Sequence, residues 1–349
     1  MANLLTITAV SKQYFGTTEP SLHLFSIAVN KGTTLALMGE SGSGKTTLLR
    51  LIAGLEDLSS GEIYFQGKKL PGPKDKLVAG MPNIRLINQN LTIPPNQSIA
   101  ASIGYQLRHH AHDYKIARTD ELLSLFQLAE YAEKQPNELS GGQRQRALFA
   151  WAIADEPDLL LMDEPLSHLD DMFKDYLYEQ VFKILKKSKN TVIFATHQAS
   201  EVFRLADEVV LMQEGKSIQQ GQPEYIYNFP TTVAAAKLMG ACNVFPARKF
   251  FKIFIEEQPD NSVLPNQKII IRPHHLNWNE CLEDNAALAI GEVKQILFMG
   301  GYFEIKIKID KTENFLYRPI IFIHSPQRPS AVGVKVALSW VQKSWVLVD

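Results

Sequence analysis

The chain has 349 residues, with 36 Lys and Arg against 37 Asp and Glu and a formal net charge of −1 at pH 7. This length predicts two or three folding units, and the balanced charge argues against a protein that binds a polyanion through bulk positive charge. The two cysteines are too few for a disulfide framework, so we expect a reducing compartment.

The sequence contains no stretch suited to spanning a membrane as a helix. The uncharged stretch 86–107 carries Asn, Gln and Pro residues, which a helix in hydrocarbon would not tolerate. The first residues lack a basic region followed by an apolar core, so no signal peptide is expected. We therefore expect no membrane-spanning segment.

The sequence pattern of the N-terminal part of the chain predicts several strands and one helix. Apolar and polar residues alternate over 5–9 and again over 25–29, as in strands with one buried face. A short apolar strand over 35–38 runs into a glycine-rich loop, and a helix is expected over 45–53. A strand, a glycine-rich loop and a helix thus follow one another directly.

The middle of the chain alternates between helices and buried strands. Helical signals dominate from about 90 to 154, and apolar residues recur every four positions over 173–185. Continuous apolar runs over 159–162, 191–196 and 209–212 predict strands that are covered on both faces. Strands that alternate with helices predict an α/β fold with a mostly parallel sheet and right-handed crossovers.

The last third of the chain has a different character. Helical periodicity nearly disappears after about Gly240, so we place a boundary there and expect domains over 1–240 and 241–349. The strands expected in the second domain are 268–271, 291–297, 302–309, 315–323 and 332–348. Their number and spacing predict a separate all-β unit, a small barrel or a sandwich.

The glycine-rich loop matches the phosphate-binding pattern G-x-x-x-x-G-K-[ST]. Its glycines let successive backbone N–H groups point at phosphate oxygens, while Lys45 would reach the β- and γ-phosphates and the Thr46 hydroxyl would ligate Mg²⁺. The strand before the loop and the helix after it favour this function over an accidental glycine-rich turn. The residues expected to bind nucleotide here are Gly39, Glu40, Ser41, Gly42, Ser43, Gly44, Lys45, Thr46 and Thr47.

Two acids, Asp163 and Glu164, end the buried strand over 159–162. In parallel sheets of this kind, an acid at the carboxyl end of such a strand lies beside the phosphate loop. Asp163 would hold Mg²⁺ directly or through water, and Glu164 would orient and polarise the attacking water. Taken alone, the two acids could equally be a solvent-exposed strand end, but the phosphate loop favours a catalytic site.

A helical run opens with Ser140, Gly141, Gly142 and Gln143. Alone, this segment is a helix-entry turn with Ser140 as N-cap. Together with the phosphate loop and the acidic pair, it is similar to the signature of ATP-binding cassette (ABC) ATPases. The resemblance extends over residues 4–240, and it places Gln89 at the glutamine loop, Asp170 at the end of the D-loop and His197 at the switch-histidine position.

This resemblance implies a P-loop NTPase cassette with a mostly parallel sheet, an antiparallel β edge and a helical insert over about 90–157. It implies ATP and Mg²⁺ as cofactors, with Thr46, Gln89 and Asp163 facing the metal. It also implies a head-to-tail dimer in which each ATP lies between two subunits. The phosphate loop of one subunit and the signature of the other, Ser140, Gly141, Gly142 and Gln143, would enclose it.

Catalytic roles follow from the same resemblance. Lys45, Gln89 and His197 would contact the γ-phosphate region, Glu164 would be the general base, and Asp170 would connect the two sites of the dimer. The family stacks an aromatic residue on adenine near the N-terminus. Tyr14 is expected in this place, with its neighbour Phe15 as the alternative.

The chain departs from the family pattern at two positions. His168 stands in the D-loop where a small residue is usual, and Trp151 stands where the helix after the signature usually carries Arg. Neither change removes a catalytic group. A cluster of His109, His110 and His112 has no carboxylate or Cys pattern to complete a metal site, so we expect solvated surface there.

The number and spacing of the motifs exclude some classes of ABC ATPase. The phosphate loop and the signature are too close in sequence for a coiled-coil chromosome protein, and there is one cassette where ribosome-associated members carry two. The resemblance therefore implies a separate ATP-binding subunit of an importer, peripheral on the cytoplasmic face of the inner membrane. Its partners would be integral-membrane permease subunits, a second cassette (a homodimer is favoured) and, indirectly, an extracytoplasmic solute-binding protein; no nucleic acid is expected. The alternative is a non-transport ABC ATPase that acts mechanically on DNA or the ribosome.

The C-terminal domain carries a second, looser resemblance. Residues 271–276 read Ile-Arg-Pro-His-His-Leu and are similar to the I-R-P-E-H-L element of the TOBE-type accessory domain, with His274 in place of the usual acid. This domain occurs on importers for sugars, polyamines, ferric iron and oxyanions. It implies a regulatory or dimer-stabilising module, and a domain that only adds stability is the alternative.

Overall fold

The computed structural model describes residues 3–76, 80–88, 93–164, 171–176, 182, 190–251, 264, 266–280, 289–310, 320–340 and 345–349. Three residues named above, Gln89, His168 and Asp170, lie outside these ranges. Contacts divide the chain into two compact units, Met1–Pro223 and Glu224–Asp349. In the part of the chain that is described, no helix is both long and apolar enough to cross a membrane.

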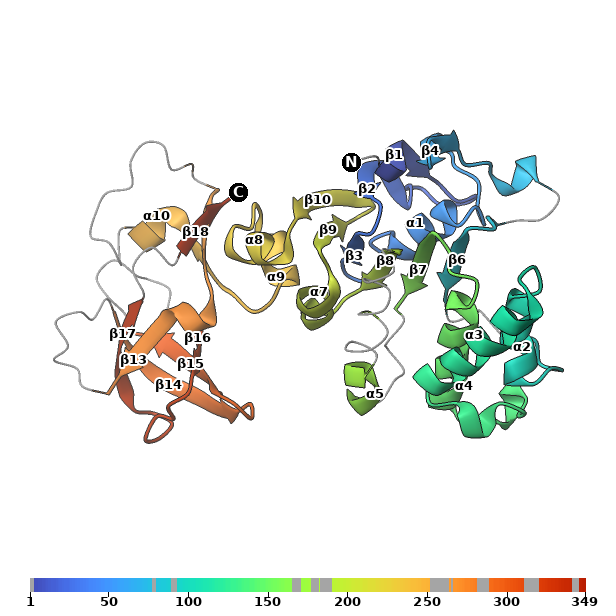
Figure 1. Ribbon diagram of the computed structural model, residues 1–349. Coiled ribbons are helices and arrows are strands. Elements are labelled where there is room, and N and C mark those ends of the chain that lie inside the picture. Colours follow the sequence, from blue (N-terminus) through green and yellow to red (C-terminus); the bar gives the residue numbers. More distant parts are fainter. Residues whose placement is uncertain are drawn as a thin grey trace. The chain divides into compact units, whose positions relative to one another are not determined.

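An antiparallel sheet begins the first unit (Figure 1). Its strands lie in the order β2 (Leu22–Asn30), β1 (Asn3–Lys12), β4 (Ser60–Phe65) and β5 (Lys68–Lys69). The alternation read from the sequence is visible in β2, where Phe25, Ile27 and Val29 are buried and the residues between them are exposed. The two strands expected over 5–9 and 25–29 are therefore present, and both are longer than the sequence pattern indicates.

A second sheet has six strands and is mostly parallel. Its order is β10 (Lys216–Gly221), β9 (Glu208–Gln213), β3 (Thr34–Met38), β8 (Thr191–Thr196), β7 (Leu159–Asp163) and β6 (Ile84–Ile87). Only β10 runs antiparallel, paired with β9 at the edge. Met38 pairs with Thr196, and Asp163 pairs with Ala195. The carboxyl ends of β3, β7 and β8 therefore meet at one edge, which brings the loops after them together.

Helix α1 (Lys45–Ile52) follows β3 and buries one face, as its run of leucines predicts. A single hydrophobic cluster contains Leu5 of the antiparallel sheet, Leu49 of α1 and Leu161 of the second sheet. This shared core fixes the start of α1 relative to both sheets.

Among the described residues, the insert between β6 and β7 contains the α-helices α2 (Ile99–Gln106), α3 (His112–Leu125) and α4 (Gly141–Ile153) (Figure 1). They pack on one another, and α4 also contacts β6. Ser98 caps α2 and Ser140 caps α4, each accepting a hydrogen bond from a backbone N–H of the first turn. Two other α-helices of this unit lie within the described residues, α5 (Asp171–Tyr176) and α7 (Ala199–Leu205). The helix expected over 173–185 is described only in α5 and at Phe182.

The second unit is mainly β-structure. One sheet has the order β11 (Asn243–Pro246), β12 (Lys268–Ile271) and β18 (Trp345–Val348). The other has the order β13 (Leu276–Asn279), β17 (Lys335–Trp340), β14 (Ala289–Phe298), β15 (Phe303–Ile309) and β16 (Ile320–Ser325). Isoleucines of both sheets, among them Ile269 and Ile305, share one core with the short helix α10 (Ala247–Phe250). The expected β-sheets are present, together with the short helix α10, and the described part of the run over 332–348 contains β17 and β18.

Helices α8 (Pro223–Asn228) and α9 (Val233–Leu238) precede the β-strands of the second unit. The division after Pro223 places them with those strands, whereas the sequence suggested a boundary near Gly240. The packing explains the difference, because Ala236 of α9 forms a cluster with Ile270 and Val348. Helical periodicity alone could not tell which neighbour these helices pack against.

Candidate nucleotide site

The phosphate loop lies between β3 and α1, at the sheet edge where three carboxyl ends meet. Gly42 and Gly44 have φ of +81° and +98°, values that L-residues rarely adopt. A Cβ on Gly44 would also lie 2.6 Å from the carbonyl oxygen of Ser21 at the start of β2. Backbone conformation therefore favours glycine at both positions, and close packing requires glycine at Gly44 as well.

Lys45 is buried, and its ammonium is held by the loop itself. Nζ donates to the carbonyl oxygens of Gly39 and Glu40, both at 2.8 Å, and to Ser43 Oγ at 3.3 Å. Burial lowers the pKa of Lys45, while the carboxylates of Glu164 and Asp163 act in the opposite direction. The loop thus folds around a cation that faces the two acids.

Thr46 and Asp163 meet across the site. The Thr46 hydroxyl donates to Asp163 Oδ1 at 3.1 Å, although the two residues are far apart in sequence. Burial is the largest influence on Asp163 and raises the pKa of its carboxyl; the hydrogen bond from Thr46 lowers it, and nearby Glu164 raises it further. A hydroxyl and a carboxylate oxygen side by side are hard oxygen donors of the kind that Mg²⁺ prefers.

Glu164 and His197 form the other side of the site. Glu164 has a positive φ of 48°, and its backbone N–H donates to the carbonyl oxygen of Ala195 at 3.1 Å. Its Oε1 lies 3.5 Å from Nδ1 of His197, which follows β8. Non-glycine residues with positive φ are uncommon and tend to occur at functional sites. The expected general base and switch histidine are therefore brought together.

A pocket of about 200 Å³ lies over the phosphate loop. Its lining residues are Ser21, Ser41, Gly42, Gly44, Lys45, Thr46, Thr47 and Glu164. Residues of the loop thus share one concave surface with an acid from the end of β7, as the motifs predict.

Sequence reasoning missed a buried acid behind His197. Glu201 of α7 is only 4% exposed, and its Oε2 accepts a hydrogen bond of 2.5 Å from the Thr196 hydroxyl, whose oxygen in turn accepts from the backbone N–H of Gln198. Burial is the main cause that raises the pKa of Glu201. This chain of hydrogen bonds holds the backbone on both sides of His197. The only signal in the sequence is an acid four residues after the histidine.

The signature segment forms a separate, outward-facing element. Ser140 Oγ accepts from the Gln143 N–H at 3.3 Å, and Gln143 Oε1 accepts from the Ser140 N–H at 3.0 Å, so the two residues form a capping box. Ser140 and Gly141 are exposed, and neither is among the residues that line the pocket. In a single chain the phosphate loop and the signature are therefore distinct surfaces.

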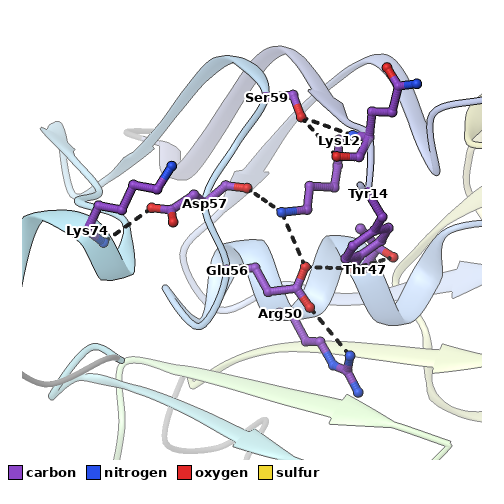
Figure 2. A network of polar contacts seen from close by, with 9 residues as sticks. Lys12, Tyr14, Thr47, Arg50, Glu56, Asp57, Ser59 and Lys74 are labelled. Carbon is purple, nitrogen blue, oxygen red and sulfur yellow. Dashed lines mark hydrogen bonds and ion pairs between the residues drawn. The ribbon is translucent and has the colours of Figure 1, made fainter. Parts of the chain in front are cut away.

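Tyr14 lies at the edge of the site, just after β1, where a polar network holds it (Figure 2). Its hydroxyl donates to Glu56 Oε2 at 2.6 Å and lies 3.4 Å from Thr47 Oγ1 of the phosphate loop. The alternative aromatic, Phe15, is fully exposed. The Tyr14 side chain is therefore held by hydrogen bonds, whereas the Phe15 side chain is exposed to solvent.

Trp151, one of the two departures from the family pattern, makes a cation–π contact between the insert and the parallel sheet. The guanidinium of Arg85 on β6 lies 5.6 Å from the ring centroid of Trp151 on α4. The histidine cluster is exposed as expected, and His110 pairs with Asp155 at 2.9 Å. No group of three or more potential metal ligands occurs among the described residues.

Comparisons with known proteins agree with this geometry. Residues 22–167 match the family described as "ABC transporter". The iron(III) import ATP-binding protein FbpC 2 of Haemophilus influenzae is 33% identical over 316 residues, which are 88% of each chain. The spermidine/putrescine import ATP-binding protein PotA of Haemophilus ducreyi is 31% identical and covers 93% of this chain and 91% of its own.

A solved structure with a similar fold is a dimer of the ATP-binding cassette MJ0796 in a post-hydrolysis state with ADP and Pi. It has a TM-score of 0.55 and 24% identity, and the match covers 62% of this chain and 98% of that one. The expected cassette fold is therefore confirmed. The chain belongs to the ABC transporter family and is one of its ATP-hydrolysing, ATP-binding subunits.

Proposed function

We propose that this subunit hydrolyses ATP with Mg²⁺ between two cassettes in order to drive the import of a small solute. The observation that carries the proposal is the meeting of Lys45, Asp163, Glu164 and His197 at one sheet edge, beside a pocket lined by the phosphate loop. The two import subunits named above are similar over nearly the whole chain, which favours import over mechanical work on DNA or the ribosome.

The phosphate loop and its lysine would bind and orient the triphosphate. Thr46 and Asp163 would hold Mg²⁺, because their oxygens already lie 3.1 Å apart and both are donors suited to this ion. Gln89, outside the described residues, is the third ligand we propose. The bound ion would neutralise charge on the β- and γ-phosphate oxygens.

Glu164 would act as the general base. Its carboxylate would orient and polarise the attacking water, and His197, 3.5 Å away, would stabilise the charge that develops on the γ-phosphate. Lys45, which lines the same pocket as Glu164, would add positive charge. Asp170, which lies outside the described residues, is proposed to connect the two sites of a dimer.

The second cassette would complete each site with its signature. Ser140, Gly141, Gly142 and Gln143 would supply the helix start and backbone N–H groups as a second anion site. Three features support this: Ser140 and Gly141 are exposed, the segment does not line the pocket in one chain, and the similar cassette MJ0796 is a dimer with ADP and Pi. We propose a homodimer, because the chain carries every part needed for two equal sites.

Permease subunits are the proposed membrane partners, and they would hold the cassettes on the cytoplasmic face of the inner membrane. The uncharged stretch 86–107 is the proposed contact region. Within it, Ala101 and Tyr105 of α2 are exposed, while Ile99 is fully buried and serves the core of the insert. A solute-binding protein would deliver the cargo to the permease, and iron(III) and polyamines are the solute classes that the relatives suggest.

The second unit would be an accessory module of the TOBE type. Arg272 of the I-R-P element is buried and donates to carbonyl oxygens of Tyr227, Ala236, Gly240 and Ala241. It therefore fastens the β-sheets to α8 and α9. We propose that this module regulates the subunit or stabilises its dimer.

The variant Glu164→Gln tests the proposed function. It keeps the shape of the side chain but removes its basicity, so ATP hydrolysis should fall at least about 100-fold while ATP still binds. The trapped ATP should shift the protein to a dimer in size-exclusion chromatography with light scattering. Glu62→Gln, an exposed acid paired with Lys69, is the matched control and should hydrolyse ATP at the wild-type rate. Wild-type turnover by Glu164→Gln would show that this carboxylate is not the general base.

A further inference from the structure

Glu56, in the loop after α1, is the centre of a polar network next to the nucleotide pocket (Figure 2). Its Oε2 accepts the Tyr14 hydroxyl at 2.6 Å and lies 3.6 Å from Lys12 Nζ, while its Oε1 lies 3.4 Å from Arg50 of α1. The side chain is only 17% exposed. The mostly buried carboxylate of Glu56 thus lies between the cations of Lys12 and Arg50 and accepts a hydrogen bond from Tyr14.

The network connects the strand that ends near Tyr14 with the helix that carries the phosphate loop. Lys12 Nζ donates to the carbonyl oxygen of Asp57 at 2.8 Å and lies 4.9 Å from the centroid of the Tyr14 ring. On the other side, the Tyr14 hydroxyl approaches Thr47, which lines the pocket. The Tyr14 hydroxyl is therefore hydrogen-bonded beside the phosphate loop, and the Lys12 ammonium lies over the Tyr14 ring.

The ionisation state of the phenol suits this geometry. Burial, followed by the hydrogen bond to Glu56, raises the pKa of Tyr14, so the hydroxyl stays protonated and can donate. Hydrogen bonds to a charged acceptor are about twice as strong as neutral ones. The hydrogen bond to the Glu56 carboxylate is therefore the strongest of the contacts that the Tyr14 hydroxyl makes.

We propose that Glu56 is a positioning residue for ATP, which holds Tyr14 in place so that its ring can stack on the adenine. The inference rests on the proposed function, because it assumes that the triphosphate lies in the phosphate loop. A ring that is fixed before the ligand arrives loses little conformational entropy on binding, and this raises affinity. Glu56 would therefore strengthen the binding of the adenine base and leave the binding of the phosphates unchanged.

The test measures the affinity of the full chain for ATP and for inorganic tripolyphosphate, which has the phosphates but no base. In Glu56→Ala, ATP should bind about tenfold more weakly, equivalent to about 1.4 kcal/mol, whereas tripolyphosphate affinity should change less than about twofold. Glu56→Gln keeps an acceptor for the phenol and should recover part of the loss. Asp57→Ala is the matched control, since the Asp57 side chain accepts from the Lys74 N–H and points away from Tyr14 (Figure 2); it should leave both affinities unchanged.

A double-mutant cycle separates positioning from general stability. Tyr14→Phe should weaken ATP binding several-fold, and adding it to Glu56→Ala should cause no further loss, because both act through one hydroxyl. Tyr14→Phe also keeps the test valid if Glu56→Ala does not fold. Equal losses for ATP and tripolyphosphate in Glu56→Ala, or wild-type ATP affinity in both Tyr14→Phe and Glu56→Ala, would overturn the inference.

The remaining outcomes are equally decisive. If Phe15→Ala loses ATP affinity while Tyr14→Phe and Glu56→Ala do not, the exposed Phe15 is the stacking residue and Glu56 has no part in binding the base. If the wild-type chain binds neither ATP nor tripolyphosphate, the proposed function itself fails. That result differs from every outcome in which only the role of Glu56 is refuted.

Discussion

Three glycines of the phosphate loop allow backbone strain and steric contact to be measured separately. Gly42 has a positive φ, but a Cβ there would meet nothing within 4 Å. Gly39 has no positive φ, but its Cβ would lie 2.3 Å from the carbonyl oxygen of Met212. Gly44 combines both, with φ of +98° and a Cβ 2.6 Å from the carbonyl oxygen of Ser21. Alanine substitutions at these positions should therefore differ in a defined way.

The expected losses of unfolding free energy follow from the two effects. A left-handed conformation costs an L-residue about 1–2 kcal/mol, and the lower entropy of the unfolded alanine variant offsets about 0.4–1 kcal/mol, so Gly42→Ala should lose about 1 kcal/mol. Overpacking costs about 1–3 kcal/mol, so Gly39→Ala should lose about 1–2 kcal/mol after the same offset. Gly44→Ala carries both penalties and should lose about 2–4 kcal/mol.

Urea unfolding of the full chain without nucleotide, followed by circular dichroism, measures these losses. The comparison requires equal m-values, because a changed m-value would mean that the native or denatured state itself had changed. Free energies for Gly44→Ala and Gly42→Ala that agree within about 0.5 kcal/mol would refute the steric part of the reasoning. Such agreement would show that the segment around Ser21 moves away from the phosphate loop at little cost in free energy.

Three further predictions concern other parts of the molecule. Burial raises the pKa of Glu201 above its ordinary 4.5, so the wild type should lose stability as pH rises from 4.5 through the native pKa. The Gln side chain of Glu201→Gln does not titrate, so its free energy of unfolding in urea should rise relative to that of the wild type between pH 4 and pH 8. A difference in unfolding free energy that does not change with pH would contradict this. Arg272→Met removes the donor to four carbonyl oxygens and should destabilise the second unit by about 3 kcal/mol, visible in its thermal transition. An unchanged thermal transition would contradict a fastening role. Thr46→Val removes one proposed metal ligand, so ATP affinity should fall about tenfold with MgCl₂ and stay unchanged in EDTA, whereas equal losses in both would argue against metal ligation by this hydroxyl.

The positions of the phosphate loop and of the two acids could be predicted from local sequence patterns, and that of His197 from the resemblance to ABC ATPases. Each follows a buried apolar strand, and parallel strands bring their carboxyl ends to one edge. The contact between Thr46 and Asp163 was therefore implicit in two local motifs, and the structure shows the hydrogen bond. The cassette fold and the ATPase activity could be predicted on the same basis.

Other features depend on tertiary contacts that no local pattern encodes. Glu56 contacts a tyrosine 42 positions away, and nothing around it in the sequence marks it as special. Arg272 was visible only as part of a short motif, because its acceptors are backbone carbonyls, which every residue possesses. The placement of α8 and α9 depended in the same way on which surface Ala236 covers.

The hydrogen bonds of Lys45 have a consequence for ligand selection. An ammonium has three N–H donors, and Gly39, Glu40 and Ser43 accept them at 2.8, 2.8 and 3.3 Å. An incoming oxygen must therefore compete with acceptors that the chain itself supplies, and the Ser43 hydroxyl, the most distant, is the easiest to displace. A neutral oxygen gains little by this exchange, whereas a charged phosphate oxygen forms a stronger bond than the hydroxyl it replaces. Because its donors are already satisfied within the chain, Lys45 should favour charged phosphate oxygens over neutral ones.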